Sequence, residues 1–242
     1  MISKATIQYV RSLQDKKQRQ KYGHFVVEGE KSITELLKSN FEIQTVYTLN
    51  ECFNHFSKSR KGQEIVEVTD KELTQISAHK APQKALAVVK IPAVPKIDRQ
   101  AKFILALDEI QDPGNLGTII RIADWYGISQ IVCSKGCTDV YNPKCINSTM
   151  GSFLRVEVIY DDIISVAETT NLPLMVAVFD GKNVHESGLP QKGILVIGNE
   201  GHGVNSKIID KAMVKLTIPK FGGAESLNAA VSTAILLDNL MR

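Results

Sequence analysis

The chain has 242 residues, of which 43% are apolar and 23% charged, and its formal net charge at pH 7 is +3. This length allows one large domain or two ordinary ones, each able to bury a core. No stretch approaches the roughly 18 uncharged apolar residues of a membrane span, and the basic N-terminal segment lacks the apolar centre of an export signal, so we expect a cytoplasmic protein.

The first ninety residues alternate between helical and extended patterns, which predicts a small α/β sandwich as a domain at residues 1–92. The predicted helices cover residues 4–21, 30–38, about 50–60 and a segment opened by Asp70, and the predicted strands cover 24–29, 43–49, 64–69 and 85–91. Asp70, with Leu73 three residues later, gives a helix cap without a full capping box.

Positive charge is concentrated in this first part. Residues 1–98 hold 16 lysines and arginines against 11 acidic residues, a net charge of +5, whereas residues 99–242 hold 13 against 15, a net charge of −2. The first 21 residues carry six basic side chains against Asp15. Such a run is either an ordinary solvated helix face or a basic arm that binds a phosphate backbone.

The stretch "VKIPAVPKIDRQ" (89–100) contains two prolines and mixed charge, and we interpret it as a linker to a second domain at residues 100–242. Continuous Val/Ile/Leu runs predict strands of a parallel sheet that is covered on both faces. These strands are expected at 103–110, 130–134, 155–160, 174–180, 193–198 and 214–219, and the helices at 115–127, 143–153, 161–170 and 226–242. Ligands of such doubly wound sheets bind beyond the carboxyl ends of the strands.

The four cysteines have no CxxC spacing and no histidine close to them in sequence. We therefore predict reduced packing thiols and no metal site.

The segment "IGNEGHGV" (197–204) has its glycines in a GxxGxG pattern, whereas a dinucleotide-binding Rossmann loop has GxGxxG. Ile218 stands where such a loop needs an acid, and no phosphate-binding GxxxxGK[ST] loop occurs. The segment is thus either a tight strand-to-helix connection or a different kind of cofactor loop, with Glu200 as its one acid.

Two further segments accompany this loop. In "DEIQDPGNLGTIIRIADWYGI" (108–128), Asn115 stands at a natural helix cap, and Arg121 follows among apolar residues, either as a surface cation or directed at an anion. In "GGAESLNAAVSTAILL", Ser226 and Asn228 open a helix. Because GxSxG is absent, Ser226 is not a hydrolase nucleophile.

Together, "DPGNLGTIIRIADWYG", "VIGNEGHGV" and "IPKFGGAESLNAAVSTAIL" resemble, in order and spacing, the three motifs of the SpoU (TrmH-like) family of SPOUT RNA 2′-O-ribose methyltransferases. The resemblance covers about 140 residues, from the strand at 103 to the C-terminus. "NSTMGSFLRVEV" resembles the family's stretch between the first two motifs, and "RQKYGHFVVEGEKSITELL" is similar to the ribosomal-protein-like RNA-binding domain of many members.

This resemblance implies a parallel-sheet α/β knot, a deep trefoil knot, as the catalytic domain after the small RNA-binding sandwich. It implies a homodimer that uses S-adenosylmethionine, without metal, to methylate a ribose 2′-hydroxyl of structured RNA, with rRNA favoured over tRNA. Three alternatives stay open: a catalytically inactive RNA-binding ribosome-assembly factor of the same fold, a tRNA-directed ribose methyltransferase, and a base methyltransferase, which "NEGHG" with "ESLN" disfavours.

The resemblance also implies site residues. Arg121 matches the arginine proposed as the base in the family, although a guanidinium stays protonated at neutral pH, so holding a phosphate and polarising the hydroxyl is an alternative role. The other expected catalytic residues are Asn115, Glu200, Ser226 and Asn228. The expected cofactor-binding residues are Ala177, Phe179, Asp180, Ile197, Gly198, Asn199, Gly201, Ile218, Leu227 and Asn228. For Ile218 and Leu227, packing in the core is an equally good explanation.

Overall fold

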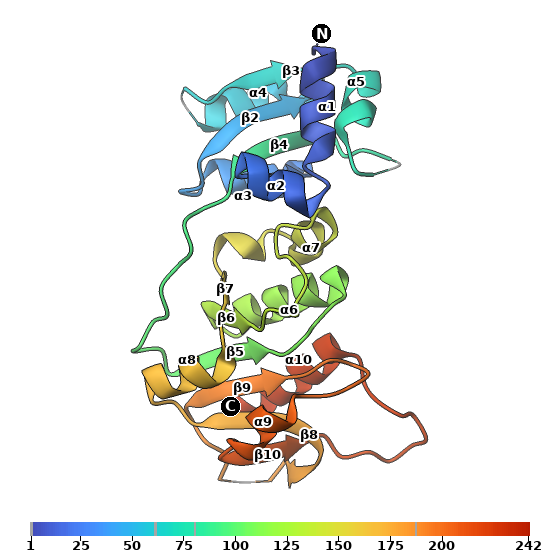
Figure 1. Ribbon diagram of the computed structural model, residues 1–242. Helices are drawn as coiled ribbons and strands as arrows, with labels where there is room; N and C mark the ends of the chain where they lie inside the picture. Colours follow the sequence, from blue (N-terminus) through green and yellow to red (C-terminus); the bar gives the residue numbers. More distant parts are fainter. Residues whose placement is uncertain (1, 61, 80, 187) are drawn as a thin grey trace. The chain divides into compact units, whose positions relative to one another are not determined.

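The structure is a computed structural model that describes residues 2–60, 62–79, 81–186 and 188–242. The chain forms two compact units (Figure 1). The first unit contains residues up to Ala93 together with Tyr141–Leu154, and the second contains Val94–Val140 and Arg155–Arg242.

The first unit is a three-layer sandwich around a four-stranded sheet of order β1-β4-β2-β3. Only the β2–β3 pair is parallel; β4 runs antiparallel to both β1 and β2. Helices α1 and α5 share a core with one face of the sheet, and α3 and α4 share a core with the other. The strands are β1 (His24–Glu28), β2 (Ile43–Thr48), β3 (Ile65–Glu67) and β4 (Ala85–Lys90), and the helices are α1 (Lys4–Ser12), α2 (Lys16–Tyr22), α3 (Glu30–Leu37), α4 (Asn50–Ser59) and α5 (Asp70–Ile76).

The prediction of a single helix at residues 4–21 is wrong, because α1 ends at Ser12 and a separate helix, α2, begins at Lys16. The Asp15 carboxylate accepts the backbone N–H groups of Lys17 and Gln18 and so starts a new helix. Arg19 is buried, and its Nη1 donates to the carbonyls of Leu13 and Gln14 at 2.9 and 2.8 Å. One of the six basic side chains of this segment therefore has a structural role.

The cap predicted at Asp70 is also wrong. Thr69 precedes α5 as its N-cap, with a full capping box: its hydroxyl accepts the N–H of Glu72, and the Glu72 carboxylate accepts the N–H of Thr69. The hydrogen bonds that the Glu72 carboxylate accepts from the backbone N–H of Thr69, the N–H of Ile2 and the Thr69 hydroxyl lower its pKa to about 2.

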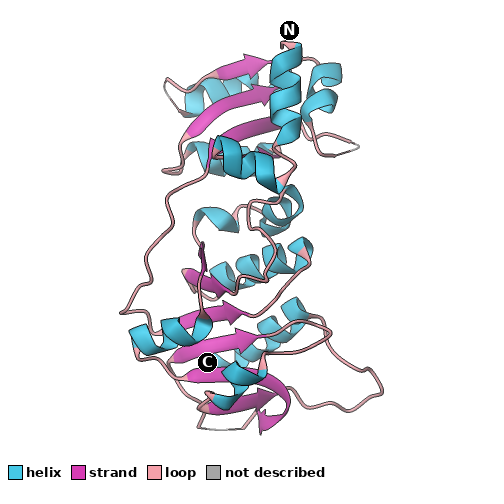
Figure 2. Ribbon diagram, viewed as in Figure 1, coloured by secondary structure: helices cyan, strands magenta, loops and turns pink. Residues whose placement is uncertain are grey.

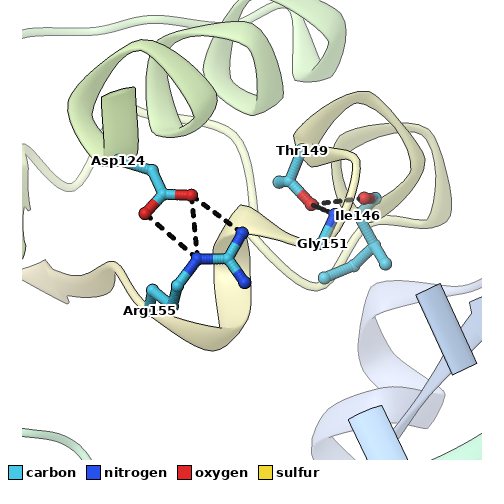
Figure 3. Close-up of polar contacts among 5 residues, drawn as sticks. All are labelled: Asp124, Ile146, Thr149, Gly151 and Arg155. Carbon is cyan, nitrogen blue, oxygen red and sulfur yellow. Dashed lines mark hydrogen bonds and ion pairs between the residues drawn. The ribbon is translucent and has the colours of Figure 1, made fainter. Parts of the chain in front are cut away.

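Residues 141–154, which lie between β6 and β7 in the chain, pack within the first unit. They form α7 (Pro143–Thr149) and the short 3-10 helix η1 (Ser152–Leu154), so the helix predicted at 143–153 is interrupted. Figure 3 shows how α7 ends: the Thr149 hydroxyl donates to the Ile146 carbonyl at 2.6 Å and accepts the Gly151 N–H at 3.3 Å. Ile146 and Phe153 join the core around Phe25.

The second unit contains a six-stranded sheet of order β10-β8-β9-β5-β6-β7 in which every neighbouring pair is parallel. All six predicted strands are confirmed, as β5 (Phe103–Leu107), β6 (Gln130–Cys133), β7 (Glu157–Tyr160), β8 (Leu174–Asn183), β9 (Gly193–Ile197) and β10 (Val214–Thr217). The helices are α6 (Pro113–Trp125), α8 (Ile163–Thr170), α9 (Ser206–Asp210) and α10 (Ala229–Leu240). The predicted set lacked α9, which is only five residues long.

β8 is longer than predicted and irregular. Its pairing with β10 jumps from Val176 to Lys182, opposite the consecutive residues Lys215 and Leu216. Residues 177–181 therefore bulge out of the register with β10.

An ion pair fastens the end of α6 to the residue that leads toward β7. The guanidinium of Arg155 faces the carboxylate of Asp124, with its Nε 3.0 Å and its Nη2 2.9 Å from the same carboxylate oxygen (Figure 3).

All four cysteines, Cys52, Cys133, Cys137 and Cys145, are buried free thiols, as predicted. Within the described ranges, no helix has the length and apolar character needed to cross a bilayer.

Candidate active site

Two loops of the second unit meet beyond the carboxyl ends of β5 and β9, which are neighbours in the sheet. The loop after β5 leads into α6, and the loop after β9 carries the three glycines. α10 packs beside α6 and brings the third motif to the same place. The three segments singled out in the sequence are thus adjacent in the fold, at the edge where doubly wound sheets bind ligands.

Asn115 is not the cap of α6, contrary to the sequence interpretation. Asp112 is the N-cap, with Pro113 as the first helical residue, and its carboxylate accepts the N–H of Asn115 at 2.9 Å. The amide side chain of Asn115 is therefore available for contacts with the other motifs.

A chain of side-chain hydrogen bonds joins the three motifs. Asn228 Nδ2 donates to Asn115 Oδ1 at 2.9 Å, and Asn115 Nδ2 donates to Glu200 Oε1. Asn228 is the N-cap of α10, and its Oδ1 accepts the N–H groups of Ala230 and Val231. Because backbone donors fix the oxygen end of Asn228, they also fix the direction of both amides, and Glu200 becomes the acceptor at the end of the chain.

The glycine loop is a tight hairpin in which Asn199 and Gly203 exchange both backbone hydrogen bonds, at 3.1 and 2.9 Å. A Cβ on Gly198 would lie only 2.3 Å from the Gly203 carbonyl carbon, so only glycine fits there. Asn199 Oδ1 accepts the N–H of Gly201 at 2.8 Å, and its Nδ2 donates to the Glu109 carbonyl at 2.9 Å. Asn199 thus fixes the loop to the turn that follows β5.

Arg121 and Ser226 are exposed, and in the described part of the chain neither has a hydrogen bond or ion pair with Asn115, Glu200 or Asn228. Arg121 lies on α6, six residues or about 1.7 helical turns beyond Asn115. Its exposure leaves the guanidinium available to an anionic ligand. The structure therefore joins three of the five predicted catalytic residues by hydrogen bonds, and Arg121 and Ser226 are not part of that chain.

The predicted cofactor-binding residues lie on three segments of the same edge. Ala177, Phe179 and Asp180 belong to the bulge in β8, where the Phe179 carbonyl accepts the Thr217 hydroxyl at 3.0 Å. Ile197 is the buried last residue of β9 and precedes Gly198, Asn199 and Gly201.

The third segment, residues 218–228, is the loop between β10 and α10 (Figure 2). Ile218 is half-buried, and Leu227 is 45% exposed. Exposure of Leu227 argues against a packing role in the core of this unit.

These residues suit a cofactor that is held by backbone groups. The bulge in β8 leaves residues 177–181 out of the ladder with β10, and the close approach at Gly198 places two backbone segments where a side chain would obstruct. Such a site offers a ligand mainly backbone N–H and C=O groups as donors and acceptors.

Three residues that position the site were not identified from the sequence. Asp112 is the N-cap, which its place before Pro113 signals. Asp108 is buried and accepts the Asn205 N–H at 2.8 Å, which fixes the start of α9. Glu109 has a positive φ of 56° that turns its carbonyl toward Asn199, and no sequence pattern signals this.

The buried thiol of Cys137 contacts the end of β5, just before this turn. Cys137 donates to the Leu107 carbonyl at 3.2 Å. Hydrogen bonds, above all from Cys133, lower the pKa of the Cys137 thiol, although its burial acts in the opposite direction.

Comparison with known proteins identifies the family. A model of the SpoU rRNA Methylase family matches residues 102–238, and a model of the MRM3-like substrate binding domain matches residues 4–87. The chain is 31% identical over 234 residues to the 23S rRNA (guanosine(2553)-2'-O)-methyltransferase RlmP of Bacillus subtilis, with 95% of this chain and 93% of that protein covered.

Several solved structures resemble the whole chain, among them the following two. A TrmH-family structure from Porphyromonas gingivalis has a TM-score of 0.88 and 32% identity, covering 99% of this chain and 98% of that one. The AdoMet-bound rRNA methyltransferase from Sinorhizobium meliloti has a TM-score of 0.89 and 26% identity, covering 99% and 95%. With the three motifs joined at one edge of the parallel sheet, these matches show that the chain belongs to the SpoU rRNA methylase family.

Proposed function

We propose that this protein transfers the methyl group of S-adenosylmethionine to a ribose 2′-hydroxyl of structured RNA, with rRNA as the favoured substrate. The observation that carries this proposal is the hydrogen-bond chain from Asn228 through Asn115 to Glu200, because it joins all three motifs in one polar cluster. The Bacillus subtilis relative, named for ribose methylation of 23S rRNA, supports the choice of substrate.

S-adenosylmethionine, when bound, supplies a methyl group already activated by its sulfonium. The backbone of Gly198 and its neighbours, the bulge in β8 and the loop that contains Leu227 would hold it. The remaining task of the protein is to align a ribose hydroxyl, accept its proton and exclude water.

Each polar residue of the site has a distinct part in this task. Arg121 is permanently cationic and holds the phosphate beside the target ribose. Asn115 and Asn228 have their donor and acceptor ends fixed, so they orient the ribose, and Ser226 adds a hydroxyl at the start of the same helix.

Glu200 differs from the other four proposed catalytic residues in its proton chemistry. Asparagine and serine side chains are neutral and the guanidinium stays protonated, whereas a carboxylate binds and releases a proton readily. Glu200 therefore receives the proton of the ribose hydroxyl, directly or through a water molecule.

The wider organisation is part of the same proposal. Residues 100–242 are the methyltransferase domain, with a deep trefoil knot around the cofactor loops, and residues 1–92 bind substrate RNA in the cytoplasm. Two copies form a homodimer through α6 and α10, which pack together and expose large apolar side chains: Trp125 is 85% and Val231 48% exposed.

The decisive experiment is transfer of a tritiated methyl group from S-adenosylmethionine to unmodified 23S rRNA, 16S rRNA and tRNA transcripts, followed by digestion to nucleosides. We expect a 2′-O-methylnucleoside in rRNA, formed without added metal. Label on a base would refute the ribose assignment, and label in tRNA alone would establish the tRNA-directed alternative.

Absence of label in every RNA, together with binding of S-adenosylhomocysteine and rRNA, would instead identify an inactive assembly factor. The Glu200→Gln variant tests the proton assignment. Its single-turnover rate should fall by about 100-fold or more, whereas a wild-type rate would exclude Glu200 as the acceptor.

A further inference from the structure

Three aromatic rings gather at the start of the sheet in the first unit. Tyr9 lies in α1, Tyr22 is the last residue of α2, and His24 is the first residue of β1. The Tyr9 ring stands perpendicular to both others, with centroids 5.1 Å from Tyr22 and 6.4 Å from His24. Among the large hydrophobic side chains described in residues 2–93, Tyr22 alone is exposed, at 42%. The Tyr22 ring is therefore not part of the hydrophobic core of this unit.

Two neighbouring features restrict the position of the Tyr22 ring. The Tyr9 hydroxyl donates to Gln44 Oε1 at 2.9 Å, which fixes the ring that Tyr22 contacts. Gly23, in the left-handed conformation with a φ of 67°, ends α2 directly after Tyr22 and turns the chain into β1. The exposed ring is thus a preorganised surface that loses little conformational freedom when a ligand covers it.

The helix that ends at Tyr22 is strongly basic. Helix α2 reads KKQRQKY and has no acidic residue; the Asp15 carboxylate before it is engaged by the N–H groups of the first turn. Lys16, Lys17 and Lys21 are exposed, and Lys21 Nζ lies 5.3 Å from the centroid of the Tyr22 ring.

We propose that Tyr22 is a stacking platform for an unpaired RNA base and that Lys16, Lys17 and Lys21 bind the flanking phosphates. An exposed aromatic ring within a basic surface is the combination by which proteins bind single-stranded nucleic acid without reading its sequence. A base within a duplex has both faces covered by its neighbours, so the ring selects an unpaired nucleotide.

Lys21 changes its partner when the base arrives. An ammonium over an exposed ring is only weakly held, so the incoming base displaces it and the released Lys21 binds a phosphate. The inference rests on the proposed function, since it names the part of the substrate domain that grips the RNA.

The test uses the full-length chain and fluorescence anisotropy with two probes, a labelled 12-nucleotide oligouridine and a labelled 12-base-pair RNA duplex. We expect Tyr22→Leu to bind the oligouridine about 10-fold more weakly, because stacking on one base is lost, and Tyr22→Phe to bind it as the wild type does. Binding of the duplex should change less than 2-fold in either variant.

Charge is tested by a matched pair of substitutions. Lys17→Gln should lower the slope of affinity against salt by about 0.7, the value of one phosphate contact to a single strand. Lys58→Gln removes an equal exposed charge from α4, on the other face of the sheet, and should leave the slope unchanged.

Wild-type affinity of Tyr22→Leu for oligouridine, or an equal loss for both probes, would overturn the stacking site. If that variant does not fold, cross-linking of a 5-iodouridine oligonucleotide to the wild-type protein decides, with the peptide that contains Tyr22 as the expected product and cross-links elsewhere alone as the refutation. Methyl transfer is measured separately: its absence beside Tyr22-dependent binding would refute only the proposed function, and its presence beside Tyr22-independent binding only this site.

Discussion

Replacement of Gly198 by alanine tests the central claim about the glycine loop, namely that two backbone segments approach too closely for any side chain. The new Cβ would lie 2.3 Å from the carbonyl carbon of Gly203 and 2.4 Å from both its oxygen and the Val204 nitrogen. All three atoms belong to the backbone, so a side chain cannot rotate to relieve the clash, and the Gly203–Val204 peptide has to move by about 1 Å to reach van der Waals distance.

Such a movement breaks the hairpin between Asn199 and Gly203. Its two backbone hydrogen bonds contribute about 0.5–1.5 kcal/mol each, so Gly198→Ala should destabilise the protein by about 2 kcal/mol. For a chain of this length that corresponds to a fall in Tm of about 4–8 °C. If the same free energy is needed to restore the loop on binding, the affinity for S-adenosylmethionine falls about 30-fold.

Thermal unfolding and calorimetric titration with S-adenosylmethionine measure the two effects. Gly201→Ala is the matched stability control in the same loop, because its Cβ would meet nothing closer than Asn199 Oδ1 at 3.4 Å, an ordinary contact. That control should change stability by less than about 0.5 kcal/mol. A Gly198→Ala protein with the wild-type Tm and the wild-type cofactor affinity would refute the close approach.

Four other outcomes are expected. Arg121→Ala and Arg121→Lys should keep their fold and cofactor affinity but lose at least about 100-fold in the single-turnover rate of methyl transfer. Lysine should not rescue the rate, since its point charge cannot replace the bidentate contact of a guanidinium with a phosphate. Near-normal transfer by either variant would remove Arg121 from the mechanism. Asn115→Leu should remove the hydrogen-bond link between Glu200 and the third motif, so that kcat falls strongly while Tm changes little. An unchanged kcat would mean that the hydrogen-bond chain is structural only. Because hydrogen bonds hold the pKa of Glu72 at about 2, its carboxylate should stabilise the capping box fully above about pH 4.5 and lose that effect as the pH falls toward 2. The Tm of Glu72→Gln should therefore decline less between pH 5 and 3 than the Tm of the wild type. An equal decline in both proteins would contradict this. Arg155→Met should lower the Tm by no more than about 3 °C, because the Arg155 side chain is 50% exposed and solvent screens its ion pair with Asp124. A larger fall in Tm would show that solvent screens the pair less than this exposure implies.

The sequence alone determined the arrangement of the second unit well. Six runs rich in Val, Ile and Leu predict six strands of a parallel sheet, and all six exist. The inner strands β5, β6 and β9 are apolar and buried along nearly their whole length because helices cover both faces of the sheet, whereas the edge strands β7 and β10 also carry Glu157 and Lys215. The three motif segments are likewise visible in the sequence, since their glycines, asparagines and one acid interrupt apolar patterns at strand ends. The first helix failed for a local reason: a pattern of helical periodicity continues across Asp15, whereas capping by its carboxylate starts a new helix there.

Only the tertiary structure decides which contacts the motif residues make. Asn115 was interpreted as a cap from its neighbours, but Asp112 holds that position and Asn115 bonds to residues 85 and 113 positions away in the chain. The close approach at Gly198 and the contact of Asn199 with the Glu109 carbonyl likewise depend on where the backbone returns after β5 and β9. Periodicity and capping report interactions within a few residues, whereas the direction of a hydrogen bond between distant side chains is fixed by the path of the folded chain. For that reason the sequence predicts candidate residues for a site, whereas their contacts follow only from the fold.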